Sequence, residues 1–192
     1  MKFDKSIAIP FLLLVTVCSL YRIMPERPWG FAPQIAMALF SGSVVANRKY
    51  AFLLPLMSML LSDLLYEALY LNGLTPIRGF YSGQWLNYLL FAAITFIGFA
   101  VHPRKPMHWL GGTIAAVVFY FLTSNFAVWI SGGLALNNLP YERSWSGLTQ
   151  CYIAGLPFLR MSFFASLIFG AVFFGAYQLL HTGKRIGVRA TA

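Results

Sequence analysis

Residues 51–71 read AFLLPLMSMLLSDLLYEALYL, an apolar run long enough to cross a bilayer as a helix. The run carries Asp63 and Glu67 in its second half. An Asp near the centre of a spanning helix costs about 2.5 to 3.5 kcal/mol unless its side chain faces protein or water. Residues four apart lie on the same helix face, so the two carboxylates share a face. The sequence therefore predicts that this face borders other protein groups or a solvated cavity.

Composition places the whole chain in the membrane class. Its 192 residues are 59% hydrophobic and only 10% charged, with a mean hydropathy of +0.69, far from the balance of a soluble domain. Runs of about twenty apolar residues mark spanning helices. We expect an all-α bundle of six transmembrane helices forming one domain over residues 1–192, with spans at about 6–23, 30–46, 50–71, 85–101, 109–131 and 158–180.

The net charge of +9 is distributed unevenly between the two ends of the expected bundle. With both termini cytoplasmic, that side holds Lys2, Lys5, Arg48, Lys49, Arg104, Lys105, Lys184, Arg185 and Arg189, and the other side holds Arg22, Arg27, Arg78, Arg143 and Arg160. An excess of Lys and Arg marks the cytoplasmic side of membrane proteins. The pattern predicts a multi-pass protein of a bacterial inner membrane. The partners of its cytoplasmic basic residues are expected to be acidic lipid headgroups rather than nucleic acid.

The first expected span has a competing interpretation. Lys2 and Lys5 ahead of an apolar run also fit a signal peptide. Val-Thr-Val precedes Cys18, where a lipoprotein processing site needs a small residue, so we favour a retained helix. Cys18 and Cys151 form no disulfide framework.

Counting residues along the spans brings several polar side chains to one outer layer. Asp63 lies about 20 Å from the cytoplasmic start of its span at a rise of about 1.5 Å per residue. Asn125 and Trp129 reach a similar depth in the fifth span, and Arg160 lies in the first turn of the sixth. This layer has two interpretations: an Arg160–Asp63 pair that staples helices together, or a polar cavity open to the outer face.

Two outer loops, 72–84 and 132–147, are the longest connections and are rich in Gly, Asn, Ser and Tyr. Loops of this length in a small bundle often close over a ligand. The residues expected to contact one are Arg78, Tyr81, Tyr141 and Trp145. The following stretch GLTQCYIAGLPF, residues 147–158, is too short to span, and we expect an interfacial or re-entrant piece.

Catalytic motifs are scarce. No phosphate-binding glycine loop, HExxH or GxSxG occurs, and the three histidines have no carboxylate beside them. The sequence predicts no required cofactor and no metal site. Asp63 and Glu67 remain an alternative intramembrane acid–base pair acting on a lipid or cofactor.

Four segments together resemble a known family. RIMPERPWGFAPQIAMALFSG (22–42), AFLLPLMSMLLSD (51–63), TSNFAVW (123–129) and GLTQCYIAGLPFLR (147–160) are similar, in order and spacing, to the DUF6580 family of small bacterial membrane proteins, which includes cobalamin-binding, BtuM-like members. The resemblance implies a six-helix fold like the substrate-binding S-components of energy-coupling-factor transporters, with the ligand near the outer face. The motif positions shared here are Asp63, Asn125, Trp129, Cys151, Tyr152 and Arg160.

Two departures from the family pattern bear on the ligand. Glu26 and Arg27 replace a His-Pro pair, and residues 72–84 lack the cysteine that can ligate cobalt. Cys151 is then the remaining, weak candidate for a cobalt ligand, provided that it faces the cavity. These departures weaken cobalamin as the particular ligand more than they weaken uptake as the activity.

The leading hypothesis is a non-enzymatic membrane protein that binds and takes up a vitamin-like small molecule, with cobalamin or a related corrinoid as the first candidate and an energising module as a possible partner. The residues expected to bind substrate are Asp63, Asn125, Trp129, Arg160, Tyr81, Tyr152, Glu67, Arg78 and Trp145. The alternatives are the intramembrane enzyme and a scaffold subunit of a larger membrane complex.

Overall fold

The computed structural model describes residues 5–135 and 137–189, with side chains from residue 10 to residue 180. The described chain forms six α-helices, which confirms the predicted all-α class. In order they are α1 (Lys5–Ile23), α2 (Gln34–Val44), α3 (Arg48–Leu71), α4 (Gln84–Phe99), α5 (Pro106–Ile130) and α6 (Trp145–Arg189).

Three of these helices have the length and apolar character to cross a membrane. They are α3, α5 and the Trp145–Leu180 part of α6. The chain is therefore a multi-pass membrane protein. The apolar stretches Pro10–Ile23, Gln34–Val44 and Gln84–Phe99 are shorter. At about 1.5 Å per residue, the 11 residues of α2 extend only about 16 Å, roughly half of a 30 Å hydrocarbon core.

The short helix α2 is the centre of the bundle. It packs against α3, α4, α5 and α6, and most of its residues are buried. Its closest approach is to α4, where a methyl group added at Gly42 would lie 2.9 Å from Cα of Gly98 and closer still to the carbonyl oxygen of Thr95. Two glycines facing one another thus let the two backbones meet, as small residues do in membrane bundles.

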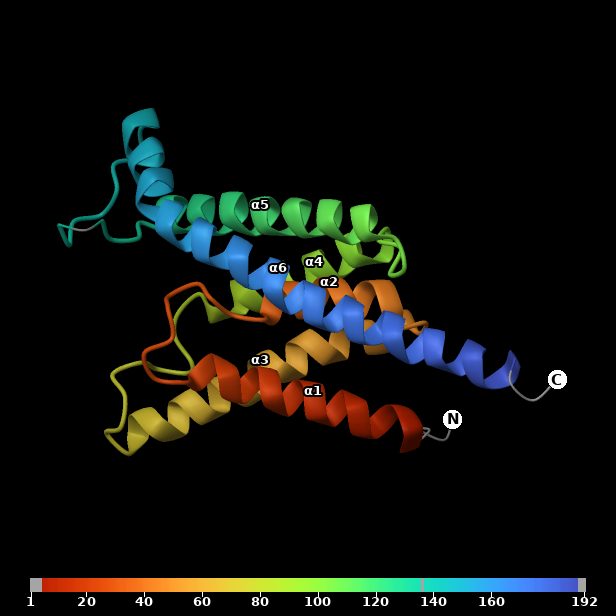
Figure 1. The fold of residues 1–192 in the computed structure, drawn as a ribbon. Helices are drawn as coiled ribbons and strands as arrows, with labels where there is room; N and C mark the ends of the chain where they lie inside the picture. Colours follow the sequence, from red (N-terminus) through yellow and green to blue (C-terminus); the bar gives the residue numbers. More distant parts are fainter. Residues whose placement is uncertain (1–4, 136, 190–192) are drawn as a thin grey trace.

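The remaining helices surround this centre in pairs. Helix α1 packs on α3, and α5 packs on α6, while α4 lies between α3 and α5. In Figure 1 the connections α1–α2, α3–α4 and α5–α6 lie together at the left end, and the α2–α3 and α4–α5 turns lie at the right, with the first residues of α1. The two long loops predicted to share one side therefore do lie at one end of the bundle, and the α1–α2 connection joins them there.

Two predicted boundaries were wrong. The second helix begins at Gln34 rather than at residue 30, because Gly30 has a φ of 82° and Pro33 caps the helix. The sixth helix begins at Trp145 rather than at residue 158, so the stretch 147–158 is part of α6 and not a separate re-entrant piece. Pro157 lies inside α6, and the helix changes direction in this region (Figure 1), which is the usual effect of an internal proline.

Candidate ligand-binding site

Asp63 is the centre of a buried polar network at the end of the bundle where the longer connections gather. Its side chain is fully buried and forms an ion pair with Arg22 at the end of α1. Its second oxygen, Oδ2, accepts hydrogen bonds from Gln84 Nε2 at 2.6 Å and from the Tyr88 hydroxyl at 2.6 Å, both on α4. Arg22 also donates to the Ser62 hydroxyl. One carboxylate thus joins α1, α3 and α4.

The partner of Asp63 differs from the predicted one. Residue counting suggested Arg160, but the ion pair is with Arg22, because α3 packs against α1. Arg160 is exposed on α6 and has no hydrogen bond or ion pair within the described part of the chain.

The connection between α1 and α2, residues 24–33, is non-helical and lies against the bundle interior. Its carbonyl groups find donors in side chains. Arg27 donates to the carbonyl oxygens of Arg22 and Phe31, at 3.2 and 2.7 Å, and the Ser162 hydroxyl donates to that of Gly30 at 3.1 Å. Irregular backbone inside a membrane protein is tolerated only where it is buried in protein or lines a cavity. The second condition holds for this connection, which lines cavities although Met24 and Trp29 are exposed.

A cavity of about 410 Å³ lies between this connection and helices α2, α4, α5 and α6. Its polar lining is Arg22, Arg27, Gln34, Tyr81, Asn87, Tyr120 and Ser162. Its other lining residues are Trp29, Gly30, Ala32, Ile35, Met59, Phe91 and Phe158. Small-molecule sites are concave and combine apolar lining with converging polar groups, and here about half of the lining residues are polar. We refer to it as the central cavity.

Most polar groups of the central cavity already have protein partners. Asn87 Nδ2 donates to the Tyr81 hydroxyl at 2.8 Å and to Gln84 Oε1 at 2.9 Å, and its Oδ1 accepts from Tyr120 at 3.0 Å. Gln34, at the first position of α2, differs: it is 2% exposed, and neither its Oε1 nor its Nε2 has a partner among the described residues. The cavity therefore combines a fixed polar frame with one unoccupied amide.

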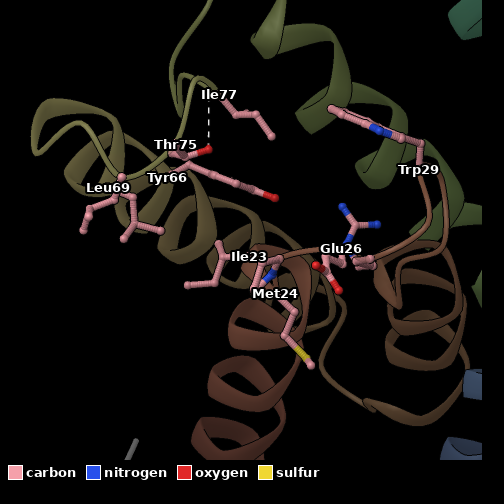
Figure 2. A pocket seen from close by; sticks show the side chains of 11 residues that line it. Ile23, Met24, Glu26, Trp29, Tyr66, Leu69, Thr75 and Ile77 are labelled. Atoms are coloured by element: carbon pink, nitrogen blue, oxygen red, sulfur yellow. Dashed lines mark hydrogen bonds between the residues drawn. The ribbon is translucent and has the colours of Figure 1, made fainter.

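A second cavity, of about 340 Å³, lies on the other side of the same connection. Tyr66 projects from α3 toward it, and Trp29 stands on the opposite side (Figure 2). The Tyr66 hydroxyl donates to the Arg22 carbonyl at 2.7 Å. Glu26 also lines this space and has a φ of 61°, which is uncommon outside glycine. Trp29 borders both cavities, so the connection separates them.

The predicted site residues of α3 and its following connection have distinct positions. Glu67 Oε2 accepts from the backbone N–H groups of Gly79 and Phe80, at 3.0 and 3.2 Å, and so fixes the α3–α4 connection. Arg78 lies over the Tyr70 ring, 5.0 Å from its centroid. Tyr81 lines the central cavity, and partial burial raises the pKa of its hydroxyl above the ordinary value. Tyr81 therefore acts as a neutral hydrogen-bonding group across the physiological pH range.

The predicted site residues of α5 and α6 lie elsewhere, at the interface between these two helices. Asn125 Nδ2 donates to Phe121 within α5, and the Tyr152 hydroxyl donates to the Leu122 carbonyl at 2.9 Å. The buried Cys151 thiol faces the Asn125 carbonyl, 3.4 Å away, and Cys151 is not among the residues that line the central cavity. Cys151 was a weak candidate for a cobalt ligand only if it faced the cavity. In this structure it does not face the central cavity.

The four remaining predicted residues lie in or near the α5–α6 connection and at the Pro157 bend, away from the central cavity. Trp129 Nε1 donates to the Glu142 carbonyl at 2.8 Å, and Trp129 and Trp145 line a shallow pocket of about 240 Å³. Trp145 is 84% exposed. Tyr141, in the same connection, has a hydroxyl whose pKa burial raises. Arg160 lines an open crevice at the Pro157 bend, together with Trp29.

Comparison with known proteins was made by family, by sequence and by structure. A family model described as a family of unknown function, DUF6580, matches residues 2–188. The chain belongs to the DUF6580 family. No curated protein and no solved structure matches this DUF6580 chain.

Sequence reasoning missed most of the residues that line the central cavity of this DUF6580 protein. Arg22 and Gln34 both occur in the segment 22–42 that carries the family resemblance, yet Arg22 was counted only as an outer charge. Asn87, in the first turn of α4, and Tyr120, within α5, belong to apolar helices, where a polar residue is itself a signal. The presence of polar residues in apolar helices was therefore a more useful guide than the estimated depth of each residue.

Proposed function

We propose that this DUF6580 protein binds a vitamin-like small molecule in the central cavity and moves it across the membrane. The observation that carries the proposal is a cavity of about 410 Å³, inside a multi-pass bundle, bordered by Arg22, the ion-pair partner of buried Asp63. Charged and polar groups inside a membrane domain usually mark substrate pathways. The apolar lining supplies affinity, and the fixed polar groups supply orientation.

The polar network supports a binding role for its carboxylates. Asp63 accepts hydrogen bonds from three side chains, and Glu67 accepts two from backbone N–H groups. A carboxylate held in this way positions its neighbours. Arg22 lines the cavity and Asp63 does not. Asp63 therefore acts on a ligand by holding Arg22 in position.

The resemblance noted in the sequence supports the S-component-like, BtuM-like part of the proposal, with cobalamin or a related corrinoid as the first named candidate. The size of the central cavity favours a compact molecule, because ligand pockets of drug-sized molecules measure roughly 300–1,000 Å³. A corrinoid would require the α3–α4 connection to move away from the cavity. That connection contacts α3 through Glu67, through Arg78 on the Tyr70 ring and through Gly79, and it is the part we propose to open.

The direction of uptake follows from charge. We propose a bacterial inner-membrane location with both termini cytoplasmic, so that the three longer connections and the central cavity face outward. An energising module remains a proposed partner that would contact the opposite end.

The proposal is tested by purifying the full chain in mild detergent and identifying co-purifying small molecules by mass spectrometry. A panel of vitamins, cyanocobalamin included, is then measured by calorimetry and by uptake into proteoliposomes. We expect at least one member to bind with a dissociation constant in the micromolar range or below. The absence of any bound molecule, binding and uptake would overturn the proposal.

A matched pair of variants locates the site. Ala32 lines the central cavity, whereas Ala115 is exposed on α5. Ala32→Phe fills the cavity and should abolish binding, while Ala115→Phe places the same ring on the outer surface and should leave it unchanged. Equal effects of the two variants would place the ligand elsewhere.

A further inference from the structure

Gln34 is the feature of the central cavity that the protein itself leaves unsatisfied. Its side chain is 2% exposed and lines the cavity, and both of its polar atoms lack hydrogen-bond partners. Buried side-chain amides are nearly always hydrogen-bonded, and one without partners is destabilising. An unpaired amide at a cavity wall therefore indicates a group that the bound ligand supplies.

The chemistry of a primary amide restricts that group. Oε1 accepts a hydrogen bond, and Nε2 donates one, from adjacent positions on one planar edge. A single ligand group satisfies both atoms only if it carries a donor beside an acceptor. We infer that the central cavity recognises its ligand through an amide edge, an N–H next to a C=O, paired with Gln34. This inference rests on the proposed function and names the ligand class.

The surroundings of Gln34 agree with a planar ligand rich in acceptors. Gln34 and Ile35 are the first residues of α2, and the first N–H groups of a helix have no acceptor within it. Arg22 adds a cation whose Nη1 alone is used by Asp63 and Ser62. Phe91 and Tyr120, stacked at 5.5 Å between centroids, provide an aromatic wall. The carbonyl oxygen of the ligand's amide would be stabilised by the positive charge of Arg22 and by the free N–H groups at the start of α2.

The other amide of the cavity does not compete for this role. Asn87 uses both Nδ2 and Oδ1 in bonds to Tyr81, Gln84 and Tyr120. Asn87 is thus a fixed part of the wall, and Gln34 is the specificity-determining residue. An amide edge occurs both in ring lactams and in carboxamide side chains, including those of corrinoids.

The test compares Gln34→Leu with wild type, because Leu keeps the approximate volume and removes the amide. The matched control is Gln150→Leu, since Gln150 is an exposed residue of α6 away from the cavity. The probes are benzamide and 2-pyridone, which carry the edge, and acetophenone and benzoate, which carry acceptors only. Binding to full-length protein in micelles is measured by saturation-transfer NMR and competition, and cyanocobalamin is titrated by calorimetry.

We expect wild type and Gln150→Leu to bind benzamide or 2-pyridone at least tenfold more tightly than acetophenone and benzoate. Gln34→Leu should lose this preference. The ligand-free Gln34→Leu protein should also melt at a higher temperature than wild type, because the unpaired buried amide is gone. A tenfold weaker cyanocobalamin affinity in Gln34→Leu would assign the edge to a carboxamide side chain, and an effect on 2-pyridone alone would assign it to a ring lactam.

Three outcomes would overturn the inference. They are no preference for amide probes in wild type, a preference that survives in Gln34→Leu, and a lower melting temperature of ligand-free Gln34→Leu, which would give Gln34 a structural role. Failure of the proposed function is distinguishable. Suppose that a vitamin binds, that Ala32→Phe blocks its binding and that Gln34→Leu does not weaken it. The proposed function is then supported, and recognition through an amide edge is contradicted.

Discussion

At the residue scale, Asp63 shows how a charge is accommodated inside an apolar bundle. Its carboxylate accepts from one cation and two neutral donors, so both of its oxygens are hydrogen-bonded. Removing one partner of a buried ion pair leaves the other charge uncompensated, which is more damaging than removing both.

Asp63→Asn should therefore destabilise the protein by about 3–5 kcal/mol, because Arg22 loses its counter-ion and the new amide N–H₂ meets other donors. The double variant Arg22→Met/Asp63→Leu should lose less than the sum of its two single variants, as coupled residues do. Urea or thermal unfolding in micelles measures both. Arg78→Met serves as control: Arg78 lies over the Tyr70 ring, and its replacement should change stability by less than about 1 kcal/mol. Strict additivity in the double variant would contradict the pairing.

The sequence was sufficient to predict that Asp63 needs a partner but not which one. Depth along each helix follows from counting at a fixed rise, so Asp63 and Arg160 were assigned to one layer. Counting does not show which helices are neighbours, and α3 lies beside α1. Gln34 was passed over for a related reason. The unpaired state of its amide depends on what packs around it, which no single sequence reveals.

At the element scale, the contact between α2 and α4 depends on the absence of side chains. Gly42→Ala should destabilise the bundle by about 1–3 kcal/mol, because the added methyl has no room between Thr95 and Gly98. Gly175→Ala on α6 is the matched control. Nothing lies within 4 Å of its added methyl, so the higher helix propensity of Ala should leave stability unchanged or raised by up to about 1 kcal/mol. The measurement is the melting temperature of each variant. Equal changes in melting temperature for the two variants would contradict the close contact between α2 and α4.

The α3–α4 connection is a second element whose order depends on one side chain. Glu67→Ala removes the acceptor of the Gly79 and Phe80 N–H groups, so hydrogen exchange at residues 78–81 should accelerate by tenfold or more. The measurement is mass spectrometry of deuterated peptides. Glu142→Ala in the α5–α6 connection is the control and should leave these residues unchanged. Unaltered exchange in Glu67→Ala would mean that other contacts hold the connection.

Helix boundaries were predicted closely where apolar runs ended at polar loops, as at α3 and α5. They failed where proline and glycine decided the outcome. Residues 30–33 are apolar enough to look helical, but Gly30 takes a left-handed conformation. Pro157 looked like a helix start, yet it lies within α6. A proline removes one backbone donor, and a long, well-packed helix tolerates that loss.

At the scale of the whole molecule, the charge asymmetry predicts orientation. In a Cys18→Ala/Cys151→Ala background, Ser82→Cys and Asn137→Cys should react with a membrane-impermeant maleimide on intact cells. Lys105→Cys, in the α4–α5 turn, should react only after permeabilisation. Labelling is read by gel shift. The reverse pattern would place the termini outside, and labelling of all three on intact cells would contradict a membrane-spanning bundle.

The shortness of α2 also bears on how the protein is made. With 11 residues, α2 lacks the length of an independent spanning segment. During synthesis it enters the bilayer either joined to α3 through the turn at residues 45–47 or only after α4 and α6 have emerged to cover it. Both routes postpone assembly of the central helix until later parts of the chain exist. The part of the molecule that contacts the most neighbours is therefore among the last to reach its final place.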